Sequence, residues 1–325
     1  MIISHQHLLT LSAIKGFGPK KIHAVAEYLR NEEMEQLSDH ELCDVIIYLI
    51  GQKILKGVKD FHPNVFMKAA ETAKRTLEKT FAHQISMVSR YEELYPKTLL
   101  YTNNEDGKES IPPFLFYKGD ISVANRRSVA IIGTREPSRE GEAASEFFAK
   151  NLAEKGVNIV SGLALGCDTF AHNGALDGNG ITTAVLGGGL DNIYPPGNAE
   201  LANRIVENGG LLLTEYSAGE VTTAYTLVAR DRLQAALSQV IIVIQTNING
   251  GTMHAVRSAT AANKAIYCVE YKKELRNEYI SGNKLLIENG VAKPIYTSWE
   301  GITNLLSTLD TLRAQSPKCS QLSLF

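Results

Sequence analysis

The sequence predicts an α/β fold: a doubly wound, mostly parallel Rossmann-like sheet with a small helical N-terminal domain. From residue 128 onward, short apolar runs alternate with amphipathic helical segments, which is typical of parallel strands covered on both faces. Residues 1–84 instead carry apolar side chains at helical spacing. The 325 residues, 44% of them hydrophobic and 21% charged, are enough for one large core with small satellites.

The charge balance does not by itself point to nucleic acid. Lysine and arginine number 33 and aspartate and glutamate 35, so the formal net charge is −2. Any anion-binding site must therefore be a local concentration of positive charge and backbone N–H groups.

The cysteines and the N-terminus predict a cytoplasmic protein. The four cysteines stand far apart in the sequence, at Cys43, Cys167, Cys268 and Cys319. They show neither metal-ligand spacing nor a disulfide framework, so a reducing compartment and no metal site are expected. No secretion signal opens the chain, and no apolar run approaches the roughly 20 residues of a membrane span. No cofactor is predicted.

The first helices flank a glycine-rich turn. Apolar residues recur at helical spacing over residues 8–14 and again over residues 22–29. The turn between them, Gly16-Phe17-Gly18-Pro19-Lys20-Lys21, resembles a helix-hairpin-helix turn. In such a turn glycines let the backbone approach a DNA phosphate, and a following lysine adds positive charge. The alternative is an ordinary turn inside a small SAM-like bundle.

The predicted Rossmann-like core spans residues 85–297. Its first part, up to residue 127, is extended and includes an aromatic-rich strand at residues 114–117. Further strands are predicted at residues 128–132, 157–160, 181–186, 211–214, 240–244 and 265–269. Helices are predicted at residues 142–155, 167–175, 198–207, 223–237 and 253–262. A C-terminal segment, residues 298–325, has one helix at 302–312 and then a flexible tail.

Glycine-rich loops follow four of these strands. Their residues are Gly133, Thr134 and Arg135; Ser161, Gly162 and Gly166; Gly187, Gly188 and Gly189; and Gly250, Gly251 and Thr252. Because the carboxyl ends of parallel strands meet at one edge of a sheet, the loops are expected to crowd together. Their backbone N–H groups at helix starts would favour phosphate. The alternative is that the glycines only make tight turns.

The absence of two known motifs limits which phosphate-containing ligand the loops are expected to bind. Neither the GxGxxG dinucleotide fingerprint nor a GxxxxGK[ST] loop is present. Basic side chains instead occur in several segments, including Arg135, Arg230 and Arg232. Arginines spread in this way fit an extended polyanion better than one compact cofactor.

Asp168 and His172 are four residues apart and would share a helix face. A carboxylate and an imidazole could perform acid–base chemistry, but no nucleophile stands in an activating context. The alternative is structural: Asp168 caps the helix start, and His172 is packed with a hydrogen-bond partner.

A series of motifs resembles the DNA-processing protein A (DprA/Smf) family, in order. They are residues 128–135 (SVAIIGTR), 161–168 (SGLALGCD), 184–196 (AVLGGGLDNIYPP), 211–216 (LLLTEY), 230–238 (RDRLQAALS) and 282–294 (GNKLLIENGVAKP). The resemblance covers roughly residues 90–295.

The resemblance implies a protein, not an enzyme, that binds single-stranded DNA and loads a RecA-type recombinase, notably on incoming DNA. It also implies a homodimer formed through the Rossmann domain, and DNA-backbone contacts at Arg135, Arg230 and Arg232. The chain departs from the family at Leu165, where arginine is usual, and at Asp231, where asparagine is usual. It also has Leu227-Val228 in place of the usual Phe-Pro. An acidic residue in a phosphate pocket lowers the affinity.

The C-terminal pentapeptide resembles the peptide with which bacterial replication and repair proteins dock on the sliding clamp. It consists of Gln321, Leu322, Ser323, Leu324 and Phe325. The three apolar side chains could fill an apolar pocket on that clamp.

Two alternative functions remain. One is a nucleotide sensor in defence against foreign DNA, which would bind its ligand through Gly187–Gly189 and Gly250–Thr252. The other is a phosphoribohydrolase of the lysine-decarboxylase-like class. Such enzymes carry a glutamate after their glycine-rich loop, where this chain has Ala255.

Overall fold

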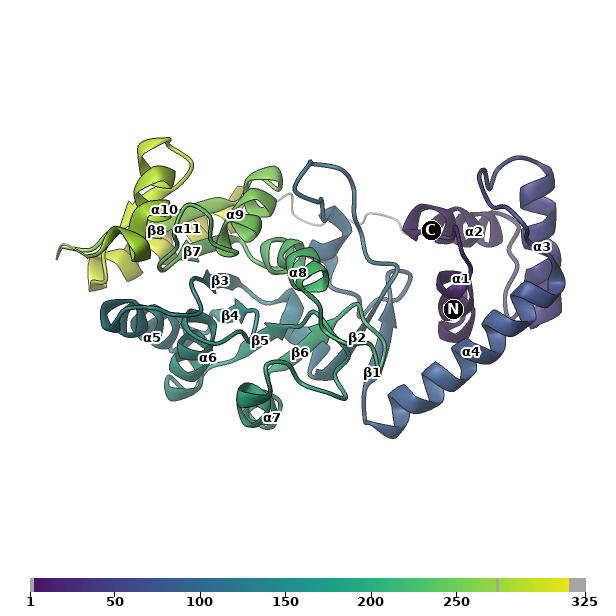
Figure 1. Ribbon diagram of the computed structural model, residues 1–325, viewed down its shortest axis with the longest axis horizontal. Coiled ribbons are helices and arrows are strands. Elements are labelled where there is room, and N and C mark those ends of the chain that lie inside the picture. The colour runs from purple at the N-terminus through teal and green to yellow at the C-terminus, as the bar shows by residue number, and fades with distance from the viewer. Residues whose placement is uncertain (1–2, 273–274, 316–325) are drawn as a thin grey trace.

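The computed structural model describes residues 3–272 and 275–315 (Figure 1). The helices are α1 His5–Ala13, α2 Pro19–Asn31, α3 Asp39–Gly51, α4 Pro63–Ala82, α5 Arg139–Ala153, α6 Cys167–Asp177, α7 Ala199–Glu207, α8 Ala224–Leu237, α9 Thr252–Ala261, α10 Asn277–Glu288 and α11 Trp299–Gln315. The strands are β1 Ser86–Ser89, β2 Phe114–Gly119, β3 Ser128–Ile132, β4 Asn158–Ser161, β5 Thr182–Val185, β6 Leu211–Thr214, β7 Val240–Val243, β8 Ala265–Val269 and β9 Lys293–Ile295.

The strands form one sheet in the order β1-β2-β6-β5-β4-β3-β7-β8-β9. Strands β3 to β9 pair in parallel, whereas β1 pairs with β2, and β2 with β6, in antiparallel fashion. The chain runs outward from β3 through β6, then returns to the other side of β3 for β7 to β9. This confirms the predicted doubly wound, mostly parallel α/β fold. The strand order reverses between β3 and β7, the place where such folds bind ligands.

Local sequence explains where the elements begin. Every residue of β3, β4, β5, β6 and β7 is buried, as the apolar runs predict. Helix α5 starts three residues before the predicted position because the Ser138 hydroxyl accepts a hydrogen bond from the Gly141 N–H. The Thr223 hydroxyl caps α8 in the same way, by accepting from the Thr226 N–H.

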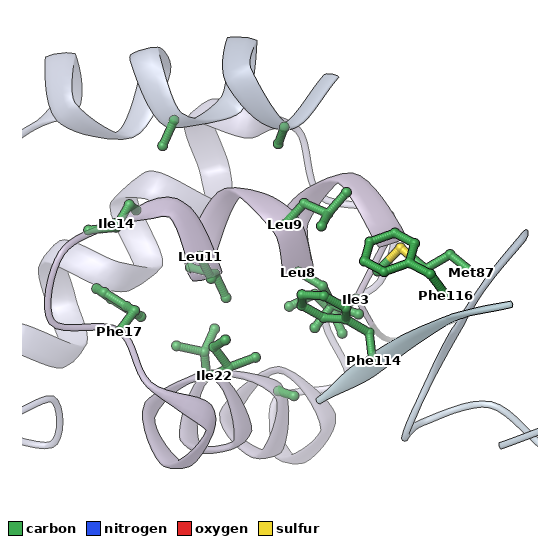
Figure 2. Packing of buried hydrophobic residues seen from close by; sticks show 14 of the residues in the cluster. Ile3, Leu8, Leu9, Leu11, Ile14, Phe17, Ile22, Met87, Phe114 and Phe116 are labelled. Atoms are coloured by element: carbon green, nitrogen blue, oxygen red, sulfur yellow. The ribbon is translucent and has the colours of Figure 1, made fainter. Parts of the chain in front are cut away.

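The helical module, α1 to α4, packs against the antiparallel edge of the sheet. Figure 2 shows Leu9 of α1 beside Met87 and Phe116, and Leu8 near Phe114. These residues belong to one buried apolar cluster that runs from the helices into β1 and β2. The apolar packing is thus continuous across the predicted boundary at residue 84. The pairing of β1 with β2 was not predicted from the sequence.

Among the described residues, no helix is both long enough and apolar enough to cross a membrane. Cys43, Cys167 and Cys268 are free and buried.

Candidate nucleic-acid interface

A cavity of about 570 Å³ lies at the point where the strand order reverses. Its walls come from the loop after β3, the loop after β4, the first half of α8, and the loop between β7 and α9. They include the predicted residues Gly133, Thr134, Arg135, Arg230, Gly250, Gly251 and Thr252. Three of the four predicted loops therefore meet at this edge, with α8 as an additional wall.

Arg135 is the exposed cation of this cavity. Its side chain stands at the rim, and it forms no ion pair with a carboxylate of the residues that the structure describes. Gly166 lies against its backbone with a φ of +79°, and a Cβ there would come within 2.5 Å of the Arg135 carbonyl. Glycine at this position therefore lets the two loops approach each other closely.

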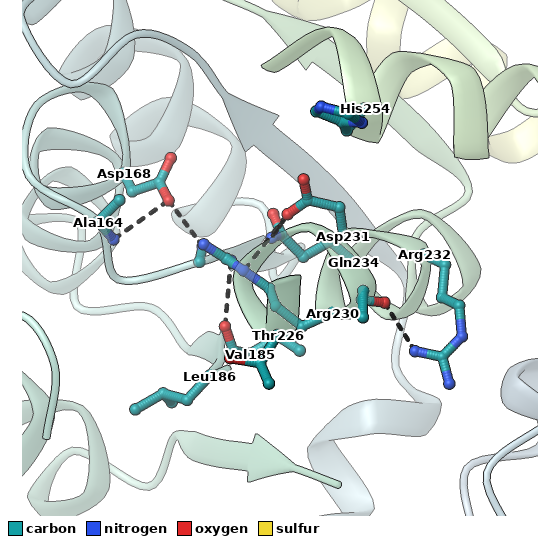
Figure 3. A network of polar contacts seen from close by, with 12 residues as sticks. Ala164, Asp168, Val185, Leu186, Thr226, Arg230, Asp231, Arg232, Gln234 and His254 are labelled. Carbon is teal, nitrogen blue, oxygen red and sulfur yellow. Dashed lines mark hydrogen bonds and ion pairs between the residues drawn. The ribbon is translucent and has the colours of Figure 1, made fainter. Parts of the chain in front are cut away.

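Arg230 is the buried cation of the cavity floor and is only 5% exposed. Its Nη1 donates a hydrogen bond to the Val185 carbonyl over 3.1 Å, and its Nε lies 3.3 Å from the Asp231 carboxylate (Figure 3). A Cβ at Gly162 would lie 1.4 Å from Nη1. Gly162 thus makes room for a guanidinium rather than for a phosphate.

Asp168 organises the loop between β4 and α6. Its carboxylate accepts hydrogen bonds from the N–H groups of Gly162 at 3.0 Å and Ala164 at 3.3 Å. Burial raises the pKa of this carboxyl, while the charge of Arg230 acts in the opposite direction. The cap residue of α6 is Gly166, so Asp168 holds the preceding loop and does not cap the helix as the structural alternative predicted.

His172 is packed with a hydrogen-bond partner, as the structural alternative predicted. The Thr182 hydroxyl donates to the Ile159 carbonyl at 2.6 Å, so it accepts from His172 Nδ1 at 2.7 Å. Burial lowers the pKa of His172 to about 3. The imidazole is therefore neutral near pH 7 and cannot supply a proton to a substrate.

Asp231 places a carboxylate in the cavity wall close to Arg230. Burial raises its pKa to about 6, with Arg230 lowering it and Asp168 raising it further. Its Oδ1 accepts a hydrogen bond from Gln234 Nε2 at 3.1 Å. An ionised Asp231 offsets part of the positive charge that Arg135 and Arg230 bring to the cavity.

Arg232, Ser161 and Gly187–Gly189 are further predicted site residues that the structure places away from the cavity. Arg232 points away from the cavity and pairs with both carboxylate oxygens of Glu215, each at 2.6 Å, so it is not aligned with Arg135. Ser161 is fully buried, and its hydroxyl donates to the Ile131 carbonyl. Gly187, Gly188 and Gly189 are buried beneath residues 217–227, where a Cβ on each would collide or nearly collide with that segment. The loop at Gly187–Gly189 therefore packs against the start of α8 and does not face the cavity.

From the sequence, Leu165 was named only as a departure from the family, and Tyr194 and His254 were not named as lining residues. Tyr194 and Leu165 are both about half exposed beside Arg135, at 46% and 51%. His254 stands in the opposite wall, 2.8 Å from Glu105 of the segment between β1 and β2. Tyr194 could have been found from the sequence, because it lies inside the motif at residues 184–196. No sequence spacing connects His254 with Glu105.

The family of the chain follows from a match that covers most of this core. A family model described as DNA recombination-mediator protein A matches residues 86–307. The chain belongs to this family. DNA recombination-mediator protein A is a family of DNA-binding mediators and not of enzymes.

Sequence relatives carry the names of the same family. Protein Smf of Escherichia coli K12 is 33% identical over 202 residues, which are 62% of this chain and 52% of that protein. DNA processing protein DprA of Streptococcus pneumoniae R6 is 36% identical over 158 residues, 49% of this chain and 55% of that protein. The chain thus spans about half the length of these curated relatives.

Two solved family members share the fold. The X-ray structure of DprA from Streptococcus pneumoniae has a TM-score of 0.74 and 28% identity, covering 94% of this chain and 98% of that one. DprA from Helicobacter pylori has a TM-score of 0.58 and 31% identity, covering 71% and 96% respectively. The latter structure is described as giving insights into the single-stranded DNA binding mode of that protein.

Asp231→Asn is expected to flatten the dependence of stability on pH. Because burial raises the Asp231 pKa from 3.8 to about 6, the folded chain holds this proton more tightly than the unfolded chain. The resulting stability is fully present below pH 3.8 and is lost as the pH rises through about 6. Urea unfolding at about pH 4 and about pH 7 should show that the unfolding free energy of wild type falls by roughly 2 kcal/mol relative to that of the variant. Equal losses in both proteins would refute the assignment.

Proposed function

We propose that this chain binds the backbone of single-stranded DNA at the cavity and acts as a recombination mediator. The observation that carries the proposal is Arg135, an exposed arginine without a carboxylate partner in the described part of the chain, at the point where the strand order reverses. An unpaired guanidinium can bind a phosphate through two parallel hydrogen bonds. Family membership and the single-stranded DNA binding of the Helicobacter pylori relative support this choice of ligand.

The rest of the cavity reinforces the positive charge locally. The starts of α8 and α9 both line it, through Thr223 and Thr252, and helix N-termini favour anions. Gly251 has no neighbour within 4 Å of a built Cβ, so a ligand can approach its backbone. This local charge is what a chain with a formal net charge of −2 needs in order to hold a polyanion.

The two alternative functions have weaker support. The nucleotide sensor would use both Gly187–Gly189 and Gly250–Thr252; the second set lines the cavity, but Gly187–Gly189 are buried. The phosphoribohydrolase needs a carboxylate at the position of Ala255, whose side chain lines the cavity. We therefore favour an extended phosphate backbone over a small nucleotide.

We also infer partners that would complete the mediator role. These are a RecA-type recombinase, which the chain would load on single-stranded DNA, and a second copy of the chain, joined through the Rossmann core. The resemblance described above supports both, and the cavity geometry is consistent with DNA held for transfer.

The bacterial sliding clamp is a further proposed partner. Its predicted docking peptide, Gln321 to Phe325, lies outside the residues that the structure describes. The support is the sequence match over all five residues.

Arg135→Ala is expected to weaken binding of a fluorescently labelled oligo-dT strand. Removing one phosphate contact should also reduce the slope of log affinity against log salt by about 0.7. Fluorescence anisotropy at several salt concentrations measures both quantities. Arg75→Ala is the matched control, since this exposed arginine on α4 pairs with Glu71 at 3.8 Å and lies outside the cavity. Equal affinities for the two variants would remove Arg135 from the DNA site.

The mediator role predicts faster filament formation by a RecA-type recombinase on DNA coated with single-strand-binding protein. Addition of the chain should shorten the lag before recombinase ATP hydrolysis, and the Arg135→Ala variant should shorten it much less. An identical lag with and without wild-type chain would leave DNA binding intact but rule out loading.

Deletion of residues 321–325 should abolish binding to the sliding clamp, because the apolar side chains that fill its pocket are removed. Binding can be measured by surface plasmon resonance with immobilised clamp. DNA binding should be unchanged in the same variant. Retained clamp binding would show that the pentapeptide is not the docking element.

A further inference from the structure

The glycine-rich turn between α1 and α2 lies beside a second turn of similar composition. A Cβ built on Gly16 would lie 3.6 Å from the carbonyl oxygen of Gly57, in the connection between α3 and α4. The rings of Phe17 and Phe61 pack 6.3 Å apart and join the same two connections. The two segments, residues 15–21 and 53–59, are here called the paired turns.

The paired turns concentrate positive charge. Together they carry six lysines and no acidic residue, namely Lys15, Lys20, Lys21, Lys53, Lys56 and Lys59. All are exposed except the half-exposed Lys21, whose amino group donates to the Gly16 carbonyl. None of them forms an ion pair with a carboxylate in the part of the chain that the structure describes. The nearest acid in sequence is the exposed Asp60.

The paired turns carry charge of one sign only, whereas the rest of the helical module carries both signs. A solvated surface usually intersperses both signs of charge, as α4 does where Arg75 pairs with Glu71. In a chain of net charge −2, six unpaired lysines on neighbouring turns create a local positive field. Their mutual repulsion is relieved when a polyanion binds.

The backbone of the paired turns is also open. Gly16 and Gly57 adopt φ values of +93° and +71°, which turn the chain sharply. Nothing lies within 4 Å of a Cβ built on Gly18 or Gly57. A phosphate can therefore approach the main chain at both turns while lysines on either side neutralise its charge.

The paired turns are remote from the cavity. Figure 2 shows Ile14 and Phe17 at the end of α1 that points away from the sheet, whereas Leu9 is near Met87 and Phe116 of the sheet. In Figure 1 the helical module lies beyond β1 and β2, at the opposite edge of the sheet from β8 and α10. A ligand bound here would therefore use a surface separate from that of Arg135.

We propose that the paired turns form a second binding surface for the phosphodiester backbone of nucleic acid. One candidate DNA-binding turn, at residues 16–21, was predicted from the sequence, and its alternative was an ordinary turn inside a helical bundle. The structure adds the second turn beside it, and with it the charge density that a single turn lacks. Contacts to phosphate alone would make this surface insensitive to base sequence.

The test compares two double variants of the full chain. Lys20→Ala/Lys56→Ala removes one exposed lysine from each turn, and Lys68→Ala/Lys74→Ala removes two exposed lysines from α4 as the matched control. Each is titrated against a long duplex and a long oligo-dT strand at several salt concentrations. We expect the first variant to bind at least one of them more weakly, with a salt slope smaller by about 0.9 per lysine on the duplex or about 0.7 per lysine on the single strand. The control should match wild type.

The outcomes separate this inference from the proposed cavity function. Loss on the duplex identifies double-stranded DNA as the ligand, and loss on oligo-dT identifies the single strand; either supports the proposal. Affinities and salt slopes equal to those of the control on both probes overturn it. Arg135→Ala tests the cavity independently with a short oligo-dT strand. If wild type fails to bind that strand but binds the duplex through the paired turns, the cavity function fails and this inference stands.

Discussion

The buried guanidinium of Arg230 ties together the elements that form the cavity. It joins α8 to the end of β5 through the Val185 carbonyl, and it fills the space that Gly162 leaves after β4. A buried charge is tolerated only when it is paired and hydrogen-bonded, because removing it from water costs several kcal/mol. Asp231 and the nearby Asp168 supply that compensation. The position of α8, and hence one wall of the cavity, depends on this arrangement.

The same carboxylates create a conflict with phosphate binding. Burial of a positive charge needs negative charge nearby, whereas a DNA backbone needs net positive charge at the rim. The two requirements are met by different arginines: Arg230 is neutralised inside, and Arg135 is exposed outside. The pKa of Asp231 is raised to about 6, so the protonation state of this carboxyl changes the net charge of the cavity near neutral pH.

The antiparallel strands β1 and β2 determine where the helical module packs against the sheet. They extend the parallel sheet beyond β6 and offer an apolar face, through Met87, Phe114 and Phe116, on which α1 packs. Because this contact uses the first half of α1, the turn at its other end is left at the surface. The fold therefore presents two basic regions of different construction: an arginine cavity made by strand ends, and lysine turns made by helix connections.

The sequence alone determined the order of elements and much of their extent. Residues 128–132, 211–214 and 265–269 were predicted as strands with the observed bounds, because short, mostly apolar runs that alternate with amphipathic helices are typical of the interior strands of a parallel sheet. It also identified the edge of the sheet where a ligand would bind, since that edge follows from strand direction alone.

Only the tertiary structure decided which of the candidate residues are available to a ligand. Arg135, Arg230 and Arg232 look alike in sequence, yet the first is exposed, the second is buried and the third is paired with Glu215. The glycines at 187–189 are covered by a segment that lies some thirty residues further along the chain. Exposure and pairing arise from contacts between residues distant in sequence, as between Gly16 and Gly57, and no local pattern encodes them.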